Sequence, residues 1–186
     1  MKLHTRALSV TCLAAAAALL AACGSTGSKA PMFSQDSLPD AIKVPGGNKV
    51  VLETVGVGEI TYECRDKANA PGQTEWVFVG PKAALNDRSG KQIGTYFGPP
   101  ATWASNDGSA ITGTQVAVSP AGAGNIPFQL VKANPATGNG AMTGVTYIQR
   151  VALKGGVAPA AACTATNKGE RQIVQYQADY IFWKAM

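Results

Sequence analysis

Residues 172–183 alternate between two kinds of side chain, and this pattern constrains the fold more than any other in the sequence. Successive residues of a β-strand point to opposite faces, so such a run predicts a long strand with one buried face. The apolar and aromatic face would consist of Val174, Tyr176, Ala178, Tyr180 and Phe182. No segment of comparable length shows a helical period, and the sequence therefore predicts an all-β protein.

Shorter β-favouring runs, separated by Gly, Pro, Asn and Asp, occupy the rest of the chain. The predicted strands cover residues 49–54, 59–65, 75–79, 92–97, 110–118, 128–132, 145–153 and 172–183. Residues 81–85 suit a single helical turn, and residues 86–90 suit a tight reversal. About nine strands with short connections predict one domain, either an antiparallel β-sandwich or a small β-barrel.

The first residues have the layout of an export signal. Lys2 and Arg6 precede an uninterrupted small and apolar run over 7–22, which is typical of a secretory signal peptide. The run ends in Leu-Ala-Ala before Cys23, which resembles a bacterial lipobox, where the cysteine receives a diacylglycerol and becomes the first mature residue. The alternative is an ordinary signal peptide, cut after Ala-x-Ala, with Cys23 unmodified.

These features predict a domain plan and an address. Residues 1–22 are the expected lipoprotein signal peptide, 23–37 a lipidated flexible tether, and 38–186 the all-β domain. Acyl chains such as palmitate on Cys23 would make a membrane one partner of the protein. Because Gly24 follows instead of Asp, the resemblance to lipoproteins implies the outer membrane of the bacterial cell envelope.

The cysteines of the mature chain form a simple set. Of the four in the sequence, Cys12 leaves with the signal and Cys23 is the predicted lipid site. Cys64 and Cys163 remain in an oxidising compartment, so we predict a disulfide between them. The alternative is two unrelated buried thiols.

Composition excludes several function classes. His4 is the only histidine and belongs to the predicted signal, which removes Ser-His and Cys-His catalysis and zinc sites built on His. Removing Lys2 and Arg6 leaves 14 basic against 11 acidic residues, a net charge of +3. This mild, scattered charge excludes nucleic acid as a partner, and no motif predicts a cofactor or a metal.

Residues 98–103 (GPPATW) and 107–109 (DGS) resemble the GPTW and DGS motifs of an exported bacterial and fungal family, domain of unknown function 3455. The resemblance covers roughly residues 38–182, and it implies no established activity. The family pattern has a His where this chain has Tyr96. A phenol, with a pKa of about 10, is a poor general base at neutral pH.

The special residues around these motifs define a candidate ligand site: Tyr96, Trp103, Asp107, Ser109 and Arg150. Trp103 could be an exposed platform for a sugar ring or a ring buried beneath the prolines. Asp107 could join a calcium site or close a turn on its own backbone. Arg150 could line a pocket or pair with an acid, and it must face away from Gln149, its neighbour on the strand.

Two functions from different classes fit these expectations. The first is a non-catalytic envelope lipoprotein that binds a glycan, a peptidoglycan fragment or a protein, including an inhibitor of an incoming hydrolase. The second is a small barrel enzyme, a lyase, isomerase or glycosidase, that uses carboxylates, Tyr or Arg. Two acids converging in a concave pocket would favour the enzyme.

Overall fold

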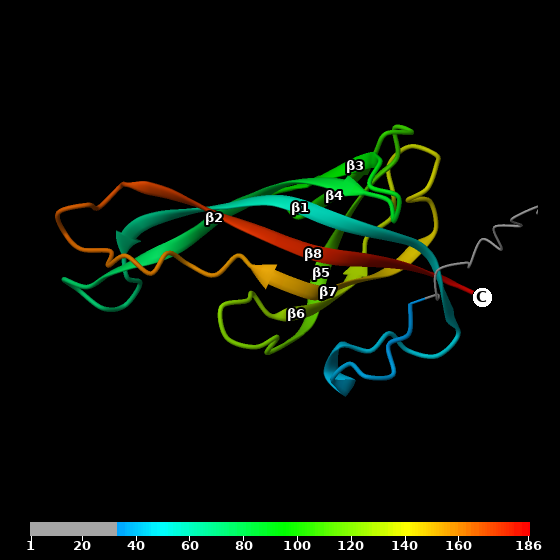
Figure 1. The fold of residues 1–186 in the computed structure, drawn as a ribbon, viewed down its shortest axis with the longest axis horizontal. Helices are drawn as coiled ribbons and strands as arrows, with labels where there is room; N and C mark the ends of the chain where they lie inside the picture. Colours follow the sequence, from blue (N-terminus) through cyan, green and yellow to red (C-terminus); the bar gives the residue numbers. More distant parts are fainter. Residues whose placement is uncertain (1–32) are drawn as a thin grey trace, which may run out of the picture. The chain divides into compact units, whose positions relative to one another are not determined.

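A computed structural model describes residues 33–186, whose strands close into a single antiparallel barrel (Figure 1). Each strand pairs with the next, and the last pairs with the first, so the barrel prediction is confirmed over the sandwich. The strands are β1 (Asn48–Asp66), β2 (Thr74–Asn86), β3 (Gln92–Phe97), β4 (Thr102–Ser105), β5 (Ala110–Ser119), β6 (Phe128–Ala133), β7 (Val145–Gly155) and β8 (Arg171–Ala185).

Three local predictions need correction. The two strands expected at 49–54 and 59–65 are one strand, β1, because Gly56 and Gly58 continue its pairing with β8 and β2. The helical turn expected at 81–85 is wrong, since these residues lie in β2 and pair with β1, and residues 82–85 also pair with β3. The short strand β4 was not expected, and it follows directly after the prolines.

The barrel interior holds the main hydrophobic core. The predicted inner face of β8 is confirmed, because Tyr176, Ala178, Tyr180 and Phe182 are all buried there. A Cβ atom on Gly56 would lie 2.6 Å from the Tyr180 ring, so glycine at this position makes room for that ring. Burial of these large side chains is the main source of stability for such a domain.

A second apolar cluster lies outside the barrel, where residues 33–47 cover β6, β7 and β8. The short 3-10 helix η1 (Asp40–Ile42) places Ile42 against the outer faces of these strands. Gln149 is fully buried beneath it, with its amide donating to Ile42 O (2.7 Å) and accepting from Trp183 Nε1 (2.9 Å). The covering segment thus accepts a hydrogen bond from a buried amide and also shields apolar surface from water.

Contacts of the folded unit begin before Leu38. The Phe33 N–H donates to Glu53 Oε1 at 3.0 Å, and its ring meets Trp183 edge-on, with centroids 6.3 Å apart. The predicted signal peptide and the lipidation of Cys23 lie outside the described residues. Among residues 33–186, no helix has the length and apolar character needed to cross a membrane.

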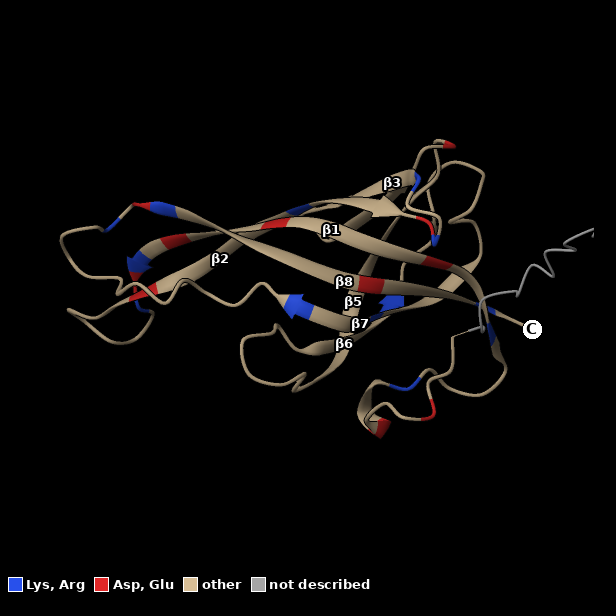
Figure 2. Cartoon of the chain, in the orientation of Figure 1, with Lys and Arg blue, Asp and Glu red and all other residues tan. Residues whose placement is uncertain are grey.

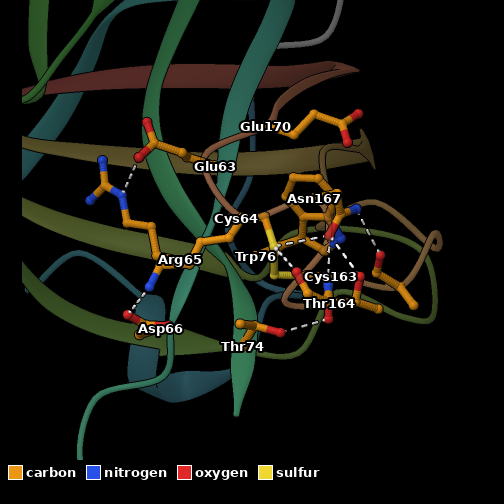
Figure 3. Close-up of a disulfide and its surroundings, with 12 residues drawn as sticks. Glu63, Cys64, Arg65, Asp66, Thr74, Trp76, Cys163, Thr164, Asn167 and Glu170 are labelled. Atoms are coloured by element: carbon orange, nitrogen blue, oxygen red, sulfur yellow. Dashed lines mark hydrogen bonds and ion pairs between the residues drawn. A yellow bond between two sulfur atoms is a disulfide. The ribbon is translucent and has the colours of Figure 1, made fainter. Parts of the chain in front are cut away.

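The predicted disulfide between Cys64 and Cys163 is confirmed (Figure 3). It joins β1 to the connection before β8, across a sequence separation of 99. Thr74 donates to the carbonyl of Cys163 at 2.8 Å, and Trp76 Nε1 donates to Ala161 O at 2.7 Å. The connection is therefore fastened to the projecting parts of β1 and β2 by a covalent bond and two hydrogen bonds.

Candidate functional site

The two ends of the barrel differ, and we name them by their loops (Figure 1). The closed end carries the chain terminus Met186 and residues 87–91, 106–109 and 134–144; the last of these is the closing loop. The open end carries residues 67–73, 98–101, 120–127 and 156–170, and 98–101 form its lip.

Asp107 holds the closing loop onto the barrel. Its carboxylate accepts hydrogen bonds from the Ser109 hydroxyl (2.6 Å), the Ser109 N–H (2.9 Å) and the Ala141 N–H (2.7 Å). These bonds hold the pKa of Asp107 well below its usual value, and the bond from the Ser109 hydroxyl contributes most. A Cβ atom on Gly140 would lie 2.4 Å from this carboxylate, so the contact requires glycine.

Ser109 continues the same network into the core. Its hydroxyl accepts a hydrogen bond from the Met142 N–H at 3.2 Å, and Met142 is 1% exposed against the interior. Within residues 33–186, no three His, Cys, Asp or Glu side chains gather to hold a metal ion. Through their hydrogen bonds, Asp107 and Ser109 close a turn and fasten the closing loop.

A pocket of about 400 Å³ enters the barrel at the open end. Side chains from β1 to β7 line it, most of them apolar or aromatic. Its polar groups come from Tyr62, Tyr96, Gln115, Gln129 and Arg150, and no Asp, Glu, His, Cys, Ser or Thr is among its described lining residues. This volume falls in the usual range for small-molecule sites.

The lip of the pocket packs closely on β2. A Cβ atom on Gly80 would lie 2.1 Å from Gly98 O, so a side chain at position 80 would push the lip away. Pro99 and Ala101 of this lip line the pocket. Glycine at position 80 thus sets the width of the entrance.

Stacked aromatic rings form the inner wall. Tyr96 and Trp103 stack with centroids 4.8 Å apart, and Tyr96 lies 4.9 Å from Tyr180. Trp103 is 1% exposed, so it is a buried ring and not an open platform. Its Nε1 has no hydrogen-bond partner among the described residues. Burial raises the pKa of all four interior tyrosines, Tyr62, Tyr96, Tyr176 and Tyr180.

Arg150 enters the pocket from β7, on the face opposite Gln149, as strand alternation requires. Its Nε and Nη2 donate to Pro127 O at 3.3 and 2.9 Å, which aims the guanidinium along the pocket wall. The charge of Arg150 opposes the rise that burial causes in the pKa of each interior tyrosine. Arg150 and the aromatic wall therefore belong to one pocket.

The structure divides the five predicted ligand-site residues between the two ends. Tyr96, Trp103 and Arg150 meet in the pocket at the open end. Asp107 and Ser109 lie at the closed end in the hydrogen-bond network that holds the closing loop. The DGS motif thus belongs to the closure of the barrel and does not line the pocket.

Sequence reasoning left out other lining residues. Tyr62 lines the pocket and donates to Gly156 O at 2.8 Å. The alternation of residues 59–65, which groups Tyr62 with Ile60 and Cys64, was the signal that could have found it. Phe78 meets Tyr62 edge-on and is 50% exposed at the entrance. Gln129 is paired with Arg150 across β6 and β7. The pattern of β6 gave no signal for Gln129, because apolar residues stand on both faces of this strand, Leu130 on the outer face and Val131 on the inner one.

Charges outside the pocket are of both signs, and several form ion pairs. Figure 2 shows acidic and basic residues on both β1 and β8. Arg88 bridges Glu53 (2.7 Å) and Asp179 (2.6 Å), and Glu63 contacts Arg65 and Arg171. These pairs fasten the outer surface of β1 to β8 and to the turn between β2 and β3.

The family described as a protein of unknown function (DUF3455) matches residues 45–184, which include all eight strands apart from Ala185, the last residue of β8. Neither a curated protein nor a solved structure matches the chain. The match covers most of the sequence and includes the motifs that build both barrel ends. The chain therefore belongs to the DUF3455 family.

Proposed function

We propose that this protein is a non-catalytic binding module of the bacterial cell envelope that holds a small ligand, or one end of a larger glycan or peptide, in the barrel pocket. The observation that carries the proposal is a pocket of about 400 Å³ that joins an aromatic wall to a single guanidinium. Concave, mostly apolar pockets with a few polar groups are the usual form of ligand sites.

The chemistry of the pocket lining supports binding over catalysis. Its described lining offers no carboxylate pair for glycoside hydrolysis and no imidazole. Burial raises the pKa of Tyr62 and Tyr96, so neither phenol is a ready base at neutral pH. Tyr and Arg here can donate hydrogen bonds and pack against a ring.

A thermal-shift screen of the protein, purified after export, tests the proposal. The panel holds peptidoglycan fragments, oligosaccharides, small organic acids and lysozymes. A ligand at a hundredfold its dissociation constant raises the melting temperature by roughly 5–10 °C. A Gln115→Trp variant places an indole at the entrance and should abolish the shift.

Thr114→Trp is the matched control, because Thr114 is exposed on the outer face of the same strand. A shift that survives Gln115→Trp would place the ligand elsewhere and contradict the proposed site. A shift caused by a lysozyme alone, unaffected by either variant, would favour an inhibitor that acts through the outer surface.

The envelope address rests on the sequence. Lipid attachment at Cys23 would hold the protein in the outer membrane, with the barrel exported. Intact mass of the purified protein should show loss of residues 1–22 and addition of acyl chains, and Cys23→Ser should remove both the lipid and the membrane association. An unmodified Cys23 in the mature protein would contradict this part of the proposal.

A further inference from the structure

Arg150 differs from every other arginine in the described residues. Arg65, Arg88 and Arg171 each contact a carboxylate on the outer surface. Arg150 contacts none among residues 33–186, and residues 1–32 contain no Asp or Glu. The only guanidinium in the pocket is therefore also the one that the described chain leaves without an acidic partner.

Most of the hydrogen-bonding capacity of Arg150 is unused. A guanidinium has five N–H donors in a planar fork. Its two hydrogen bonds among the described residues, from Nε and Nη2, both go to the single oxygen of Pro127. Nη1 and the second N–H of Nη2 have no acceptor among the described residues, and together they form the edge that binds carboxylate or phosphate oxygens in pairs.

The surroundings of this edge are suited to one kind of ligand. Gln129 and Gln115, whose amides bond each other at 2.7 Å, line the same pocket as Arg150. The stacked Tyr96 and Trp103 rings belong to its lining as well. A ligand that reached the guanidinium would place its remaining atoms against aromatic and aliphatic carbon.

We propose, building on the function proposed above, that the pocket selects a small amphiphilic anion: a carboxylate or a phosphate monoester attached to a flat apolar or aromatic body. Arg150 binds the anionic group, and Phe78, half-exposed at the entrance, packs against the body, with the buried Tyr96 and Trp103 rings forming the wall behind it. Charge attraction is stronger in a partly enclosed pocket than in bulk water, so the anionic group decides specificity. A neutral analogue leaves the guanidinium edge without a partner and binds more weakly.

Matched pairs of small probes test the inference directly by calorimetry on the exported protein. Benzoate is compared with benzamide, and phenyl phosphate with phenol, so that each pair differs in charge but shares its ring. We expect the anion of at least one pair to bind roughly tenfold to a hundredfold more tightly than its neutral partner. The pair with the larger ratio identifies the headgroup as carboxylate or phosphate.

Arg150→Gln should reduce this ratio to within about threefold, and Arg150→Lys should restore part of it because the charge returns without the planar fork. Arg65→Gln is the control. Arg65 is an exposed arginine of β1 at the open end of the barrel, and it lies outside the pocket. Melting curves accompany each variant, and the wild-type ratio stands even if a variant fails to fold.

The outcomes separate the two proposals. Equal binding of charged and neutral partners in the pocket would overturn anion selection while leaving the binding function intact. A neutral glycan could also bind while neither anion does. If Gln115→Trp abolishes that binding, anion selection is overturned and the binding function again stands. An anion preference that Arg150→Gln leaves unchanged would move the anion site elsewhere and also overturn the inference. If no probe and no panel member binds, both proposals fail.

Discussion

At the closed end of the barrel the chain satisfies its own charged group, and at the open end it does not. Asp107 meets three donors from its own turn and the closing loop. Arg150, among the described residues, meets only one carbonyl oxygen. Both are special residues near recognisable motifs, so residue type does not separate structure from site. The difference lies in whether the fold supplies the partners.

The largest expected effect concerns the covalent link at the open end. Replacing Cys64 and Cys163 together by Ala should lower the free energy of unfolding by roughly 2–5 kcal/mol, because the disulfide closes a long loop. Urea unfolding of the exported protein measures this loss. Ligand binding should persist, since the link lies beyond the pocket; a variant that keeps its stability and loses binding would assign the disulfide to the site.

Truncating one apolar side chain at each end of the barrel should give the next largest effect, and it should affect stability at the closed end and binding at the open end. Met142→Ala leaves a cavity under the closing loop and should cost roughly 2–4 kcal/mol of unfolding free energy without weakening ligand binding. Phe78→Ala, at the exposed entrance, should cost less than about 1 kcal/mol and should weaken binding. Denaturant unfolding and calorimetry are run on both. Equal stability losses would mean that the two ends are equally packed.

Alternation along strands was enough to predict much of this structure. It placed Tyr180 and Phe182 in the core and put Arg150 on the face opposite Gln149. It could not show that Asp107 and Trp103, four residues apart, belong to opposite ends and different roles. That separation depends on β4 crossing the barrel, and a strand this short has no clear period.

The prediction of a helical turn at residues 81–85 was wrong for a related reason. Their local composition suits a helical turn, but pairing with β1 and β3 on both sides outweighs local preference. The pocket itself could not be predicted, because Tyr62, Gln129 and Arg150 come from three strands that meet only when the sheet closes. Cysteine counting predicted the disulfide because, with Cys12 and Cys23 assigned to the predicted signal and lipid site, only one pairing was left.

A smaller effect should follow pH at the closed end. The folded pKa of Asp107 is lowered, so its stabilisation is present above the unfolded value of about 4 and is lost as pH falls through the folded pKa. Asp107→Asn should therefore have a lower melting temperature than wild type at pH 7, with the gap narrowing below pH 4. Ser109→Ala should remove part of the gap, and additive effects of the two changes would contradict their hydrogen bond.

The smallest effect is spectroscopic. Burial raises the pKa of the four interior tyrosines, so their ionisation should begin above pH 10 and should coincide with unfolding. Because the folded pKa lies above the unfolded value, stability is unaffected below pH 10 and falls as pH rises beyond it. Ultraviolet titration beside circular dichroism checks this. Early ionisation with the fold intact would mean that water reaches the aromatic wall.

Both limits of the described chain lie at the closed end, where Phe33 packs on Trp183 and the Met186 N–H bonds Gly47 O at 2.9 Å. An affinity tag or a fluorescent protein joined to the C-terminus therefore attaches at the end opposite the mouth of the pocket. Immobilised through its C-terminus on a sensor chip, the barrel would present its entrance to the flowing sample. The fold thus separates the point of C-terminal attachment from the pocket by the length of the barrel.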